Sequence, residues 1–230
     1  MQYNLSKKYE WPGMYTQIRN FVSRCQTCLQ AGRAVANTNF HMLTASTPGE
    51  LIEIDTVGPL PCTPRGNKFI ITAIDHFTKI AWARAVTHKS ADCVLRFLTE
   101  DVLTIFPDAK NILSDNGLEF KSATTLKVMN EKGIHWKFGS PYHPETQGVI
   151  ERFNDTIMRK LKKVCNFSHD TWDTAVHLAI DAYNKSFHRA VGCSPFELLH
   201  KETPLFSVDA GLVSKKHLKN FRTYTRNQEE

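Results

Sequence analysis

Apolar and polar positions along residues 51–86 fall into short runs that turns rich in Pro and Gly separate. Runs of this length and composition are typical of β-strands. They predict three consecutive strands, at LIEID (51–55), KFIITAID (68–75) and IAWARAV (80–86).

The apolar period then changes to the spacing of a helix. One helical face of residues 91–106 collects Val94, Leu95, Leu98, Val102 and Ile105. The following pattern predicts a strand at NILSDNG (111–117), a helix over 122–133 that Gly133 stops, a strand at IHWKFG (134–139), and two helices, one from Val149 and one over 171–184. This order predicts an α/β fold in which helices flank a mixed five-stranded sheet.

The residues before the first predicted strand have a different character. Met14, Ile18, Phe21 and Val22 repeat at helical spacing and lead into CQTC, which predicts a short helical segment. The small, polar residues that follow have no sustained period. We therefore expect four parts, namely a helical amino-terminal region (1–30), a linker (31–49), a core domain (50–203) and a basic tail (204–230).

Composition narrows the class of protein. A chain of 230 residues with 41% apolar composition can bury one good-sized core. Its net charge of +6 favours a polyanionic partner, although charge alone does not establish nucleic-acid binding. No run resembles a membrane span or a signal peptide, and the six scattered cysteines form no dense framework. We expect a soluble intracellular protein with reduced thiols.

Three acidic residues lie at the ends of predicted elements. Asp55 ends the first strand, Asp115 follows the fourth, and Glu151 lies in the first turn of the helix from Val149. Adjacent strands would bring the two aspartates together, and close carboxylates repel each other unless a cation neutralises them. Oxygen ligands without His or Cys favour Mg²⁺ or Mn²⁺ over Zn²⁺, and two such ions stabilise in-line displacement at phosphorus.

Spacing alone does not select these three carboxylates. The chain has 23 acidic residues, most of which must be solvated surface groups. Glu53, Asp75 and Glu119 are rivals for the same role.

The local sequences are more specific. LIEIDTVGPLP, ILSDNGLEF and SPYHPETQGVIERFN resemble the three catalytic motifs of retroviral and Gypsy-type long-terminal-repeat retrotransposon integrases. The 35 residues between Asp115 and Glu151 (116–150) match that family's hallmark interval. TWDTAVHLAIDAYNKSFHRAVGCSPFELL resembles the segment that follows the catalytic helix, and YEWPGMYTQIRNFVSRCQTC resembles the end of the family's amino-terminal zinc-binding domain. The matches cover most of residues 9–200.

The resemblance implies an RNase H-like fold and a polynucleotidyl transferase that processes DNA 3′ ends and joins them to target DNA. It implies two Mg²⁺ or Mn²⁺ ions, with Asp55 shared by both and Asp115 and Glu151 each completing one site. The expected partners are element-end and target DNA and further copies of the chain, in the nucleus after cytoplasmic synthesis.

Candidate DNA contacts surround the three carboxylates. They are Asn116, Gln147, His143, Asn154, Arg152, Arg159 and Lys162. Cations beside a phosphate-cutting centre are typical of a salt-sensitive, sequence-independent DNA track. The alternative is a solvated helix face for about half of the cations on that helix, and for His143 a role in shaping the turn.

The chain departs from the family in two respects. A zinc site needs four ligands, yet Cys25 and Cys28 have no His before them, and the first in the chain is His41. A pair of free thiols therefore explains CQTC better than an intact zinc site. The small carboxy-terminal DNA-binding domain of full integrases has no counterpart before Glu230. Two alternatives to an integrase remain, a domesticated DNA-binding protein without catalysis and another RNase H-like nuclease or DDE transposase.

Overall fold

A computed structural model describes residues 5–25, 45–139, 148–165 and 170–205. The chain divides into two compact units, one formed by 30–184 and the other by 1–29 together with 185–230. The domain boundaries that the sequence suggests stay predictions. None of the helices in the described ranges is long and apolar enough to cross a membrane.

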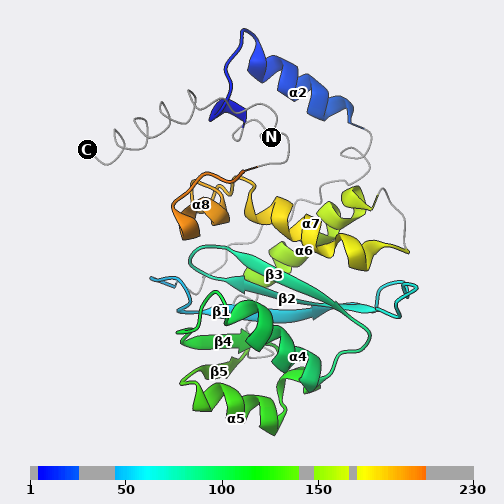
Figure 1. Ribbon diagram of the computed structural model, residues 1–230, viewed down its shortest axis with the longest axis vertical. Helices are drawn as coiled ribbons and strands as arrows, with labels where there is room; N and C mark the ends of the chain where they lie inside the picture. Colours follow the sequence, from blue (N-terminus) through cyan, green and yellow to red (C-terminus); the bar gives the residue numbers. More distant parts are fainter. Residues whose placement is uncertain (1–4, 26–44, 140–147, 166–169, 206–230) are drawn as a thin grey trace. The chain divides into compact units, whose positions relative to one another are not determined.

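The larger unit is built on a five-stranded sheet in the order β3-β2-β1-β4-β5 (Figure 1). Its strands are β1 (Ile52–Val57), β2 (Phe69–Asp75), β3 (Ala81–Val86), β4 (Asn111–Ser114) and β5 (His135–Phe138). The first three strands pair antiparallel, whereas β4 runs parallel to both β1 and β5. The prediction of a mixed five-stranded sheet is confirmed. The central strand, β1, therefore joins the antiparallel and parallel halves.

Both faces of the central strands are buried. Side chains alternate between the two faces of a strand, so Glu53 and Asp55 share one face of β1 and Ile52 and Ile54 share the other. Glu53 on one face and Ile52 and Ile54 on the other are at most 1% exposed, whereas Asp55 is half-buried. Burial on both faces explains why β2 reads as a nearly continuous apolar run rather than an alternating one.

Two long helices, α6 (Gly148–Val164) and α7 (Trp172–Asn184), pack on each other and on the antiparallel strands. The apolar stripe of α6 is buried as predicted through Phe153, Ile157 and Leu161. Phe153 meets Tyr183 of α7 edge to face, with 4.8 Å between the ring centroids. This pair anchors α6 in the core, on the face that carries Glu53 and Asp55.

The predicted helix over 91–106 is shorter than expected and is not regular. An α-helix, α4 (Ala91–Phe97), continues as a π-helix, η1 (Leu98–Val102). Because a π turn holds more residues than an α turn, the apolar face rotates, and Ile105 beyond η1 is 46% exposed. The prediction of one buried helical face was therefore wrong at Ile105. Short helices η2 (Leu118–Phe120) and α5 (Ala123–Glu131) follow β4.

The smaller unit contains α2 (Met14–Arg24) and α8 (Pro195–His200). The predicted short amino-terminal helix is confirmed, but only Met14 and Ile18 of its apolar set are buried, whereas Phe21 and Val22 are exposed. Helix α8 begins with a capping box, in which the side chains of Ser194 and Glu197 bond to each other's backbone N–H. Lys7 pairs with Glu197.

We predict that Phe153→Ala lowers the free energy of unfolding by about 3–5 kcal/mol, because it leaves a cavity between α6, α7 and the sheet. Leu178→Ala on α7 is the control, since Leu178 is 51% exposed and its loss should change stability by about 0.5 kcal/mol or less. Urea unfolding of both variants measures the difference. Equal losses would mean that the α6–α7 contact is not part of the core.

Candidate active site

Two of the predicted ligands meet where β1 and β4 lie parallel. Asp115 directly follows β4, as predicted, whereas Asp55 lies inside β1, two residues before its end at Val57. The prediction that Asp55 ends its strand was therefore wrong, because β1 continues in register with β2 through the Val57–Ile70 pair. Adjacency of β1 and β4 is confirmed, and it brings the two carboxylates close enough to interact.

The charge of Asp55 is poorly accommodated. Burial is the main cause that raises its pKa to about 6, and the neighbouring acids Asp115 and Glu53 raise it further. Two hydrogen bonds oppose this shift: the Thr56 N–H donates to Oδ1 at 2.7 Å, and the Asn154 amide donates to Oδ2 at 2.8 Å. A half-buried acid whose pKa is raised in this way, within a cluster of polar groups, is typical of functional sites.

Asp115 is held by the turn that follows β4. The Gly117 N–H donates to Asp115 Oδ1 at 2.9 Å. A Cβ atom at Gly117 would lie 3.0 Å from that oxygen and 2.8 Å from Glu119 Oε2, so a larger residue would push these two carboxylates aside. The Asn116 amide donates to the carbonyl of Gly139 at 2.8 Å. Asn116 therefore connects this turn to the end of β5. The sequence predicted a DNA contact for Asn116 and did not indicate this structural role.

Glu151 is placed on α6, one turn before Asn154. Residues three apart on a helix share a face, so Glu151 lies on the side of α6 that reaches Asp55 through Asn154. Its side chain is exposed. Among the residues that the structure describes, no three His, Cys, Asp or Glu side chains are arranged to hold a metal ion. The structure thus joins Asp55 with Asp115 and does not bring Glu151 into the same cluster.

Thr72 is a site residue that the sequence did not indicate. Its hydroxyl bonds to Asn154 Oδ1 at 2.9 Å and lies 3.3 Å from the Asp55 carbonyl. Thr72 thereby orients the Asn154 amide toward Asp55. Within an apolar strand a threonine reads as an ordinary β-former, so the only signal was a polar group in the middle of a buried run.

The three rival acids have structural partners. Asp75 is fully buried and accepts hydrogen bonds from the Gly49 N–H and from the N–H and hydroxyl of Thr78. Glu119 pairs with Lys89 at 3.5 Å. Glu53 is paired with His76 at 2.8 Å.

The structure does not test the predicted DNA contacts of the remaining candidate residues. Arg152 and Lys162 are exposed on α6, and Arg159 bonds to Asp155 and Thr156 of its own helix. Their contacts with DNA stay predictions. His143, Gln147 and Cys28 lie outside the described residues, and Cys25 follows the end of α2.

The residues present fit a hard divalent cation. Asp55 and Asp115 offer oxygen donors, and their mutual repulsion is the electrostatic problem that such a cation relieves. Asp55 and Asp115 would hold it, with Glu151 as the predicted third donor.

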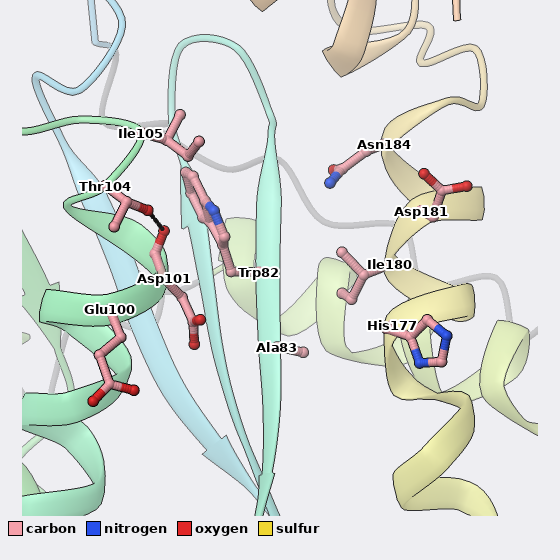
Figure 2. Close-up of a pocket in the computed structure, with 10 residues that line it drawn as sticks. All are labelled: Trp82, Ala83, Glu100, Asp101, Thr104, Ile105, His177, Ile180, Asp181 and Asn184. Carbon is pink, nitrogen blue, oxygen red and sulfur yellow. Dashed lines mark hydrogen bonds between the residues drawn. The ribbon is translucent and has the colours of Figure 1, made fainter. Parts of the chain in front are cut away.

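A separate groove of about 410 Å³ lies over β3, between η1 and α7. Figure 2 shows Trp82 at its floor, with Asp101 on one side and Asp181 on the other. It contains none of the predicted site residues. Arg84 pairs with Glu100 and Asp101 on one rim, at 2.7 Å in each case. The groove is therefore distinct from the carboxylate site.

Comparisons with known proteins agree with the motifs. Models of the integrase core domain match residues 45–144 and 132–194, and a model of the integrase zinc-binding domain matches residues 1–34. The chain is 29% identical to the Tf2-3 and Tf2-4 transposon polyproteins of Schizosaccharomyces pombe over 87% of its length. It spans 15% of the length of each polyprotein.

A solved structure is similar in fold. It is a chain of the simian T-cell lymphotropic virus intasome in complex with PP2A regulatory subunit B56 gamma. The TM-score is 0.63 at 17% identity, over 84% of this chain and 70% of that chain. This likeness confirms the predicted RNase H-like fold.

The raised pKa of Asp55 predicts a pH-dependent loss of stability. Between pH 3.8 and about 6 the folded protein binds the Asp55 proton more tightly than the unfolded chain does, so stability falls as pH rises through that window. In EDTA, Asp55→Asn should therefore be more stable than wild type by about 3 kcal/mol at pH 7.5 and equal to it at pH 3.5.

Urea unfolding at the two pH values measures this gain. Glu151→Gln, which removes an exposed carboxylate, should change stability at neither pH. A gain for Asp55→Asn that is the same at both pH values would contradict the assigned cause.

Proposed function

We propose that this chain, which belongs to the integrase family of retroviruses and Gypsy-type retrotransposons, cuts and joins DNA with divalent cations at Asp55, Asp115 and Glu151. The observation that carries the proposal is the placement of Asp55, a carboxyl whose pKa is raised to about 6 by burial and by the neighbouring acids Asp115 and Glu53. Among the described residues, its hydrogen bonds come from the Thr56 N–H and the Asn154 amide, and no cation pairs with it. The rival acids, by contrast, have structural partners.

The proposed reaction has two steps, processing of DNA 3′ ends by water and transfer of the new 3′-hydroxyls to target DNA. Mg²⁺ or Mn²⁺ bound at these carboxylates would stabilise the attacking and leaving oxygens. Asn154 and Thr72 orient Asp55 for this role, and the Gly117 N–H orients Asp115. No covalent intermediate with the protein is required.

The exposed cations of α6 supply the proposed DNA track. Arg152 and Lys162 are exposed on the helix that also carries Glu151. Contacts of this kind bind phosphates without reading sequence and weaken steeply with salt. We propose that they hold the DNA backbone over the carboxylates.

We propose further that the chain acts as a homo-oligomer in the nucleus. A zinc ion at Cys25 and Cys28 would need two further ligands.

We predict that Glu151→Gln lowers Mn²⁺-dependent strand transfer by at least about 100-fold, because loss of a metal ligand costs several kcal/mol of transition-state stabilisation. Labelled duplex ends at low salt report the reaction. Asp155→Asn is the matched control, since Asp155 is an exposed carboxylate one turn further along α6, and it should keep activity within about threefold of wild type.

Two results would contradict the proposal. Equal activity in wild type and Glu151→Gln would exclude the three-carboxylate mechanism. DNA binding without any Mn²⁺-dependent joining, and without a change when all three acids are replaced, would instead indicate a DNA-binding protein that lacks catalysis.

A further inference from the structure

Glu53 is a buried acid that lies between the central strand and the helix that carries Glu151. Its side chain is 1% exposed. Oε2 lies 2.8 Å from His76 Nε2 and accepts a hydrogen bond from the Ile150 backbone N–H at 3.2 Å. Oε1 is buried and has no hydrogen-bond partner among the described residues. Such a group is expensive to bury, so its position needs an explanation.

The Ile150 N–H explains why an acceptor is needed at this point. The first N–H groups of a helix have no partner within the helix, and Ile150 is in the first turn of α6 and 2% exposed. Water therefore has little access to its N–H. A carboxylate is a favourable acceptor here, because the amino-terminal end of a helix carries partial positive charge.

His76 holds Glu53 in place from the other side. It directly follows β2, and its own side chain is 1% exposed. Its backbone N–H donates to the Leu51 carbonyl at 2.9 Å, which fixes it against the start of β1. Glu53 is thus bound to His76 in the turn after β2 and to the Ile150 N–H in the first turn of α6.

We infer that Glu53, held by His76, is a positioning residue that fixes the first turn of α6 and so directs Glu151 toward Asp55. Ile150 directly precedes Glu151, so any rotation of the first turn moves the Glu151 carboxylate. The role of Glu151 as a ligand rests on the proposed function, whereas the anchoring of α6 does not. Glu53 acts through Glu151 and is not itself placed as a ligand, because its side chain is 1% exposed and is held between His76 and the Ile150 N–H.

The test compares Glu53→Leu, which removes the acceptor, with Glu53→Gln, whose amide oxygen can still accept from Ile150. Asp75→Asn is the matched control, since Asp75 is an equally buried carboxylate that accepts hydrogen bonds from Gly49 and Thr78, neither of which lies on α6. The readouts are hydrogen exchange of the first turn of α6 and Mn²⁺ affinity measured by calorimetry on the full chain.

We expect Glu53→Leu to speed exchange at Ile150 by about tenfold or more and to weaken Mn²⁺ binding by about tenfold. In Glu53→Gln, the exchange rate at Ile150 and the Mn²⁺ affinity should both stay within about threefold of wild type. Asp75→Asn should lower overall stability while leaving the α6 first turn and Mn²⁺ affinity unchanged. Slow exchange in Glu53→Leu, or fast exchange in Asp75→Asn as well, would overturn the inference.

Two further outcomes are separable. If Glu53→Leu does not fold, hydrogen exchange of the wild-type protein provides the test. The Ile150 N–H should then exchange more slowly than the other amides in the first turn of α6. Equal rates would overturn the inference. If the exchange results hold but wild type neither binds Mn²⁺ nor joins DNA, the proposed function fails while the anchoring of α6 by Glu53 stands.

Discussion

The parallel pairing of β1 with β4 places Asp55 beside the turn that carries Asp115, and the chemistry of the site depends on this placement. Partial burial of Asp55 disfavours its ionised form, and the neighbouring acids Asp115 and Glu53 repel its charge further. The fold therefore keeps an acid whose pKa is raised to about 6, although neutral pH favours its ionised form. Such a cost is tolerable when a bound cation offsets it, which is why the pair indicates a metal centre rather than a stabilising contact.

Helix α6 joins this site to the core. Its apolar side buries Phe153 and Ile157 against α7 and the sheet, while its polar side meets three polar groups of the sheet, Glu53, Asp55 and Thr72. Each of these groups has a hydrogen-bond partner on the helix, namely the Ile150 N–H for Glu53 and the Asn154 side chain for Asp55 and Thr72. Core packing thus fixes the helix, and the polar contacts fix its rotation.

The regular parts of the fold could be predicted from the sequence, because strand and helix periods are local properties. The five strands and the carboxylates at 55 and 115 follow from such patterns and from strand adjacency. Three features do not follow from them. The π-helix at Leu98–Val102 depends on packing, the extension of β1 beyond Asp55 depends on its register with β2, and the roles of Glu53 and Thr72 depend on partners 97 and 82 residues away in the chain.

The most direct test of the proposed metal centre is an NMR titration of the Asp55 carboxyl in the metal-free protein and in saturating Mg²⁺. We expect a pKa near 6 without metal, and a clear fall when Mg²⁺ binds, because the cation stabilises the ionised form. An ordinary aspartate pKa in the metal-free protein, or a raised pKa that Mg²⁺ does not move, would contradict the claim that Asp55 and Asp115 form a metal centre.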